Sequence, residues 1–161
     1  MVNSTLSRAN KVHLTPEGAN ELRRQLAELK DKNRPEAVDQ LAAARDLGDL
    51  EENNQYTQAK ENLALIDGRI AELEEVIANS VVIEPDKNNG HQISLGSRVT
   101  VDLGGQEIIF YLVGEWEANP SEQRISHRSP LGQQLMGKKP GEAVEVQAPV
   151  GKLVYKIVKI E

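Results

Sequence analysis

Residues 56–77 read YTQAKENLALIDGRIAELEEVI, and this stretch decides the fold of the first half of the chain. Its seam positions recur at alternating spacings of three and four residues without a break: Tyr56, Ala59, Leu63, Ile66, Ile70, Leu73 and Ile77. This period of 3.5 residues is typical of a helix that packs along one seam against a partner helix. Most of the other positions are charged, polar or alanine, so we expect one buried stripe and an otherwise solvated surface.

A partner helix is predicted upstream, beginning at Thr15-Pro16-Glu17. Threonine can cap a helix, proline loses no donor at the first helical position, and glutamate suits the positive helix end. The seam of this helix contains one stutter and runs through Leu22, Leu26, Leu29, Asn33, Ala37, Leu41 and Ala44. Pro35 lies inside the seam and predicts a local kink or turn.

Only Leu47-Gly48-Asp49-Leu50 separates the two predicted helices, which is short enough to force an antiparallel hairpin. At 1.5 Å per residue, such an arm would be about 40 Å long. The alternative is one uninterrupted dimeric coiled coil. Gly48 and the change of seam phase argue against that alternative, and we expect a monomer.

The predicted turn is strongly acidic, with Asp46, Asp49, Glu51 and Glu52 among seven consecutive residues and no base between them. One interpretation is structural: Asp49 at a helix N-cap with Glu52 three residues later fits a capping box. The other is chemical. Asp49 and Glu52 would offer oxygen ligands to a hard divalent cation such as Mg²⁺, with another molecule supplying the remaining ligands. The two interpretations are compatible, because a capping aspartate can leave one carboxylate oxygen free.

The composition limits the possible functions. The formal net charge is −6; residues 1–80 hold 15 acids against 10 bases, and residues 81–161 hold 10 against 9. An acidic chain without a basic stripe is a poor candidate for binding duplex nucleic acid unaided. The chain contains no cysteine, its three histidines lack metal-ligand spacing, and no apolar run approaches a membrane span. Because the first ten residues also lack the apolar core of a signal peptide, we expect a soluble cytoplasmic protein.

From about residue 81 the pattern changes to short runs rich in β-branched residues. The predicted strands are Val81–Glu84, Arg98–Val101, Glu107–Val113, Ala143–Val146 and Leu153–Ile160. Gly104-Gly105 is a hairpin signal, and Ser129-Pro130 is expected to start a short helix that ends at Gly137. We therefore predict an α+β protein with an antiparallel two-helix coiled-coil hairpin over residues 1–80, whose tip spans 46–56, and a sheet-and-helix domain over 81–161.

Several of these segments together resemble one known family, the bacterial Gre transcript-cleavage factors. The matching segments run in order from about residue 12 to the end of the chain: Leu14–Gly18, Arg34–Glu36, Gly48–Tyr56, Ile66–Ile70, Ile125–Pro130 and Leu135–Lys139. Within the family, the Gly-Asp-Leu tip and the lack of a strong basic patch are more similar to GreA than to GreB. The resemblance implies an FKBP-like fold for the second domain.

The resemblance also implies a function. Gre factors bind RNA polymerase, with the C-terminal domain at the rim of the secondary channel and the hairpin inside it. The family's tip Asp and Glu fall on Asp49 and Glu52, and they share a Mg²⁺ ion with the polymerase active site. The polymerase then cleaves backtracked nascent RNA near its 3′ end. By this resemblance the protein is a cofactor that completes a nuclease and is not an enzyme on its own.

Further matched residues each carry a functional and a structural interpretation. Tyr56 would contact a nucleotide or simply begin the seam, and Asn53 would orient a carboxylate or stay solvated. Arg45 and Lys60 flank the tip and would steady RNA phosphates or remain solvated charges. Ser129 and Pro130 would lie near the polymerase-docking surface or only cap a helix.

Two other functions remain open at this stage. Some Gre homologues with acid-rich tips inhibit polymerase, and Glu51 stands where the family usually has a small polar residue; Asp46 adds a further acid. A coiled-coil chaperone or prolyl isomerase is the alternative of another class. An isomerase pocket needs an aromatic lining, however, and Phe110 and Tyr111 are adjacent, so they should face opposite sides of a strand.

Overall fold

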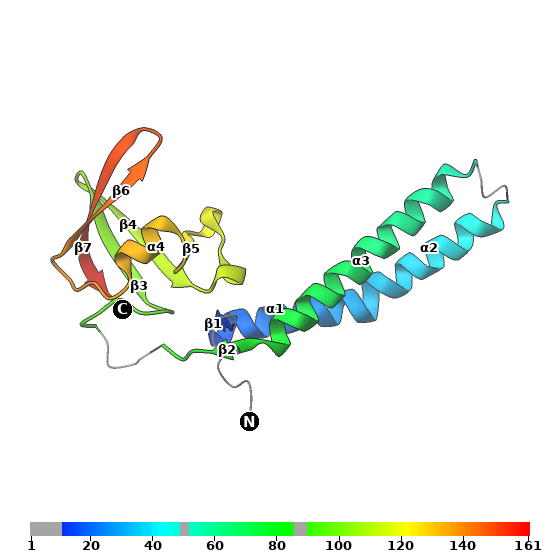
Figure 1. Cartoon of the computed structure of the whole chain (residues 1–161), viewed down its shortest axis with the longest axis horizontal. Coiled ribbons are helices and arrows are strands. Elements are labelled where there is room, and N and C mark those ends of the chain that lie inside the picture. Colours follow the sequence, from blue (N-terminus) through cyan, green and yellow to red (C-terminus); the bar gives the residue numbers. More distant parts are fainter. Residues whose placement is uncertain (1–10, 49–51, 86–89) are drawn as a thin grey trace, which may run out of the picture. The chain divides into compact units, whose positions relative to one another are not determined.

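The structure is a computed structural model that describes residues 11–48, 52–85 and 90–161. Contacts divide the chain into two compact units. One is the helical unit, Asn20–Asn79; the other is the sheet unit, which joins the described part of residues 1–19 to Ser80–Glu161. The helices of the first unit and the strands of the second confirm the predicted α+β class (Figure 1).

The helical unit contains the two predicted helical segments. The first comprises α1 (Pro16–Glu28), a π-helical turn (Leu29–Asn33) and α2 (Arg34–Asp46), and the second is α3 (Asn54–Ala78). Every residue of both predicted seams is buried or half-buried. The alternating three-and-four spacing therefore identified the packed faces correctly, although Val76 is also buried and was not among the predicted residues.

The disturbance predicted at Pro35 takes the form of the π-helical turn. Proline has no N–H to donate to the preceding turn of an α-helix. Just before it, the Arg34 N–H donates to the Leu29 carbonyl, five residues back, and α2 then starts with Pro35 in its first turn. The extra residue absorbs the stutter in the seam, since a π-helical turn holds one residue more than an α-helical turn.

Packing, more than ion pairing, holds the helical unit together. Leu73 is fully buried, with Ile70 and Val76 beside it in the seam of α3. Two ion pairs join the helical segments, Lys30–Glu74 at 2.6 Å and Arg34–Asp67 at 2.7 Å. All four side chains are nearly half exposed, so each pair contributes on the order of 0.5 kcal/mol at most.

The sheet unit is built on five strands in the order β5-β4-β3-β7-β6. Their bounds are β3 Arg98–Leu103, β4 Gln106–Val113, β5 Arg124–Ser126, β6 Ala143–Ala148 and β7 Gly151–Ile160. Neighbours are antiparallel except for β4 and β5, which are parallel. A register shift between Thr100 and Val101 interrupts the β3–β7 ladder, as a β-bulge does.

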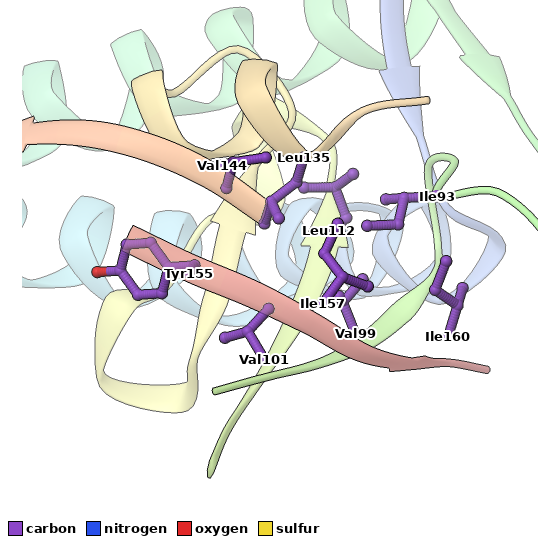
Figure 2. Packing of buried hydrophobic residues seen from close by; sticks show 9 residues of the cluster. All are labelled: Ile93, Val99, Val101, Leu112, Leu135, Val144, Tyr155, Ile157 and Ile160. Carbon is purple, nitrogen blue, oxygen red and sulfur yellow. The ribbon is translucent and has the colours of Figure 1, made fainter. Parts of the chain in front are cut away.

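One face of this sheet is covered by a single short helix, α4 (Pro130–Leu135), and the core lies between them (Figure 2). The core residues are Ile93, Val99, Val101, Leu112, Leu135, Val144, Tyr155, Ile157 and Ile160. Phe110 packs against this cluster and meets Tyr155 edge to face at 6.1 Å, whereas Tyr111 is 41% exposed. The two adjacent aromatic residues thus face opposite sides of β4, as predicted.

Two short strands were not predicted from the sequence. β1 (Val12–Leu14) was not predicted; it pairs in parallel with β2 (Ser80–Val82), which overlaps a predicted strand. β5 was also not predicted as a strand. Between β4 and β5 the chain makes two 3-10 turns, Glu115–Glu117 and Pro120–Glu122. No helix in the described parts of the chain combines the length and apolar character that a membrane span requires.

Candidate functional site

The hairpin tip begins where α2 ends. The Leu47 N–H donates to the Ala44 carbonyl at 3.3 Å and the Gly48 N–H to the Arg45 carbonyl at 3.2 Å, which closes the last turn of the helix. Gly48 has a φ of +83°, in the left-handed region that glycine adopts at little cost. Gly48 is therefore the residue at which the first helical segment of the hairpin ends.

Asn53 connects the two sides of the tip. Its Oδ1 accepts a hydrogen bond from the Tyr56 N–H at 3.1 Å, so it is the N-cap of α3. Its Nδ2 donates to the Ala44 carbonyl at 2.8 Å and to the Gly48 carbonyl at 3.3 Å. One amide side chain therefore satisfies a free N–H at the start of α3 and two carbonyls at the end of α2.

This arrangement corrects the capping box predicted from Asp49 and Glu52. The N-cap of α3 is Asn53 and the helix begins at Asn54, so the pattern of aspartate followed by glutamate does not start this helix. Asparagine is as good a cap as aspartate, and in addition it carries the donor that the α2 carbonyls require. The strong capping preference of asparagine, just before the seam begins, was the signal in the sequence that pointed to this role.

Of the two predicted metal ligands, Glu52 is exposed and Asp49 lies outside the described residues, as does Glu51. Within those described residues, Glu52 makes no hydrogen bond or ion pair. No group of three or more His, Asp and Glu side chains that could share a metal ion occurs among residues 11–48, 52–85 and 90–161. The Mg²⁺ site predicted from Asp49 and Glu52 therefore stays a prediction.

The other predicted tip residues have distinct environments. Tyr56 is half-buried at the start of the seam, which is the structural role predicted for it. Arg45 and Lys60 are exposed, and neither forms an ion pair with another described residue. Cations that are not neutralised by a neighbour remain available to phosphate groups.

Ser129 and Pro130 begin α4 as the sequence predicted. The Ser129 hydroxyl accepts a hydrogen bond from the Gly132 N–H at 3.0 Å and donates to the Ser126 carbonyl at 2.7 Å, while Pro130 occupies the first turn. Gly132 allows the close approach of α4 to β5, since a Cβ there would lie 2.0 Å from the Ser126 oxygen. Ser129 is half-buried and Pro130 is exposed.

Two family models together span nearly all of the described chain. The family model described as "Transcription elongation factor, N-terminal" matches residues 12–82. The model described as "Transcription elongation factor, GreA/GreB, C-term" matches residues 87–161. Transcription elongation factor GreA of Roseiflexus sp. is 38% identical over 151 residues, covering 92% of this chain and 96% of that protein. GreA of Bacillus subtilis is 43% identical over 149 residues, covering 91% and 94%.

The chain therefore belongs to the GreA/GreB family of transcription elongation factors. Within that family it is similar to proteins named GreA. Similar solved structures include GreA factor homolog 1 (Gfh1) of Thermus thermophilus, at 28% identity and a TM-score of 0.43, covering 94% of this chain and 99% of that chain. Another is the GreA/GreB elongation factor of Nitrosomonas europaea, at 21% identity and a TM-score of 0.43, covering 93% and 98%.

Proposed function

We propose that this elongation factor binds RNA polymerase through its secondary channel and stimulates the polymerase's own cleavage of backtracked nascent RNA. The observation that carries the proposal is the tip of the hairpin. Asn53 joins the ends of α2 and α3 beside an exposed, unpartnered Glu52 in the described structure. A narrow hairpin with a closed end and an available carboxylate suits a site that lies inside another molecule.

Two residues of the tip, Asp49 and Glu52, would hold a Mg²⁺ ion together with ligands of the polymerase active site. The chemistry supplied by the bound ion is activation of the attacking water and neutralisation of charge at the scissile phosphate. The chain's own contribution would be the two carboxylates. Asn53 supports this by holding both flanks of the tip in place, since a ligand that must be ordered on binding costs affinity.

The flanking cations would act on the RNA. Arg45 and Lys60 lie on either side of the tip in sequence, and in the described structure neither is neutralised by an acid. Each would contact a phosphate of the displaced 3′ segment, and Tyr56 would contact a nucleotide with the exposed part of its ring. The acidic net charge of the chain then ceases to be an obstacle, because the polymerase provides most of the RNA-binding surface.

The sheet unit would dock on the rim of the channel through the surface around Ser129 and Pro130. Ser129 caps α4 and Pro130 occupies its first turn, so the backbone of both residues is held in place. Pro130 is also exposed. A rigid loop–helix junction is suitable for docking because little conformational entropy is lost when it binds.

The proposal is tested by RNA cleavage in backtracked elongation complexes, with Asp49→Asn and Glu52→Gln compared with the unmodified protein. We expect each variant to cleave at least about tenfold more slowly, since the ion would lose a charged ligand. Binding to polymerase, measured by competition, should change little. Glu61→Gln is the matched control, because Glu61 is an exposed glutamate further along α3. Full cleavage by both tip variants would refute the proposed role of the two carboxylates.

The sequence also supports one alternative, an inhibitor that occupies the same channel without promoting cleavage. Glu51 and Asp46 add two acids to Asp49 and Glu52, and acid-rich tips are the feature that suggested inhibition. This alternative predicts slower nucleotide addition and no RNA cleavage, and Glu51→Ser would then relieve the slowing. Cleavage with normal elongation rates would exclude it.

A further inference from the structure

A second candidate site lies in the sheet unit, where its lining residue Arg128 directly precedes Ser129. It is a cavity of about 540 Å³, within the size range of small-molecule sites. The residues of its lining that matter here are Lys11, His13, Glu115, Trp116, His127 and Arg128. They come from the start of the chain, from the first 3-10 turn and from the loop after β5, so three distant segments form one pocket, named here the imidazole pocket.

The walls of the imidazole pocket are held together by Glu117, whose side chain is only 2% exposed. The Glu117 carboxylate accepts hydrogen bonds from the Thr15 N–H at 2.9 Å, the Gly114 N–H at 3.0 Å and the Thr15 hydroxyl. Gly114 in turn lies so close to β1 that a Cβ would come within 2.1 Å of the His13 carbonyl oxygen. The pocket is therefore preformed, because its two main walls share a buried carboxylate and a close backbone contact.

The charge of the lining is opposite to that of the chain as a whole. Lys11 and Arg128 are cations, against a net charge of −6 for the protein. The one acid, Glu115, already pairs with Arg128 at 3.1 Å.

The two imidazoles add capacity for positive charge. The rings of His13 and His127 lie 6.0 Å apart between centroids. The Nδ1 of His127 lies 3.3 Å from the Val113 carbonyl oxygen, which can only accept, so this nitrogen is the donor. The opposite nitrogen, Nε2, then remains for another partner. Permanent cations and two protonatable rings make a lining that favours a multiply charged anion.

We propose that the imidazole pocket binds the phosphate group of a small nucleotide. Lys11, His13, His127 and Arg128 would surround the phosphate, and the half-buried indole of Trp116 would pack against the base. This inference does not rest on the proposed role of the hairpin tip. It concerns a site in the sheet unit whose residues take no part in cleavage.

The test uses the intact protein and the fluorescence of Trp116, which is the only tryptophan in the chain. We expect AMP to change this fluorescence in a saturable manner, inorganic phosphate to compete with AMP, and adenosine to have little effect. The double variant Lys11→Gln/His127→Gln should bind AMP about tenfold or more weakly, since it loses two charged contacts. Glu115→Gln should bind severalfold more tightly, because Arg128 is released from its acid.

Lys152→Gln is the matched control, since Lys152 is an exposed lysine on the β6–β7 hairpin and should leave AMP binding unchanged. Thermal unfolding of each variant separates loss of binding from loss of fold; Lys11 and Glu115 are exposed, so the fold should persist. The proposal is overturned if AMP gives no saturable change at millimolar concentration, if chloride at equal ionic strength gives the same change, or if adenosine binds as tightly as AMP.

Discussion

At the scale of single residues, Asn53 carries the geometry of the hairpin tip. Its side chain makes three hydrogen bonds, one to the start of α3 and two to the end of α2. A carboxylate would provide the same acceptor but not the donor, and alanine would provide neither. Substituting aspartate removes only the hydrogen bonds to the end of α2, whereas substituting alanine also removes the cap of α3. Comparing the two variants therefore gives the contribution of each.

We expect Asn53→Ala to destabilise the hairpin tip by about 1–2 kcal/mol, as the loss of a good N-cap does. Asn53→Asp should keep the cap of α3 and lose only the bridge, at a cost of about 1 kcal/mol. Hydrogen exchange of the Tyr56 amide measures the cap directly: it should accelerate in the alanine variant and stay slow in the aspartate variant. Equal acceleration in both would show that the acceptor alone does not protect this amide.

Glu117 is a second single residue on which the stability of the sheet unit depends. It is a buried carboxylate that accepts hydrogen bonds from several donors. We expect Glu117→Gln to destabilise the sheet unit by about 2–3 kcal/mol, since one amide group would face donors that now meet a carboxylate oxygen. Urea unfolding followed by Trp116 fluorescence measures this. Glu122→Gln is the control, because that side chain is 62% exposed and should cost less than about 0.5 kcal/mol. Similar losses in both variants would contradict the assignment.

At the scale of elements, the seam between the helical segments outweighs the ion pairs beside it. Leu73→Ala removes a fully buried side chain and should destabilise the helical unit by about 2–5 kcal/mol. Asp67→Asn breaks a pair whose partners are about half exposed and should cost less than about 1 kcal/mol. Circular dichroism at 222 nm during urea unfolding compares the two. A larger loss from Asp67→Asn would mean that charge, not packing, aligns the helices.

The elements also show what a single sequence can and cannot predict. The seam of α3 repeats over more than twenty residues, so its period stands out, and its bounds were predicted to within a few residues. β1 and β5 have three residues each, too few to show a period, and their pairing depends on residues far away in the chain. The capping box failed for the same reason: Asn53 caps α3 while it contacts carbonyls of α2, and a local pattern contains no such information.

The two candidate sites also differ in how far they could be predicted from the sequence. Asp49 and Glu52 were predicted from the acidic turn and from the family motif, and Arg45 and Lys60 from their places beside it, which requires no tertiary structure. The imidazole pocket was invisible in the sequence, because His13 and His127 are more than a hundred residues apart and lack ligand spacing. Only the packing of β1 beside the first 3-10 turn brings them together.

At the scale of the whole molecule, the start of the chain belongs to the sheet unit and not to the helices that follow it. A fragment of residues 80–161 would leave Glu117 without Thr15 and β2 without its partner strand. We expect that fragment to unfold at a lower urea concentration than the sheet unit of the full chain, because its free energy of unfolding should be smaller by about 2–3 kcal/mol.

The matched design keeps residues 1–19 and joins them to residues 80–161 through a flexible linker that replaces the helical unit. This protein should unfold close to the midpoint of the full chain's sheet unit, again by Trp116 fluorescence. If the short fragment proves as stable as the linked design, the first strand contributes nothing to the sheet unit.

The bridge made by Asn53 has one evolutionary consequence. Its three hydrogen bonds end on backbone groups of Ala44, Gly48 and Tyr56, so they depend on the side chain at position 53 and on no other side chain. A substitution of the exposed Glu52, which takes no part in these three bonds, would leave them intact. Relatives that share this scaffold can in this way differ at an exposed acid of the tip and keep the same hydrogen-bonded junction between the two helices.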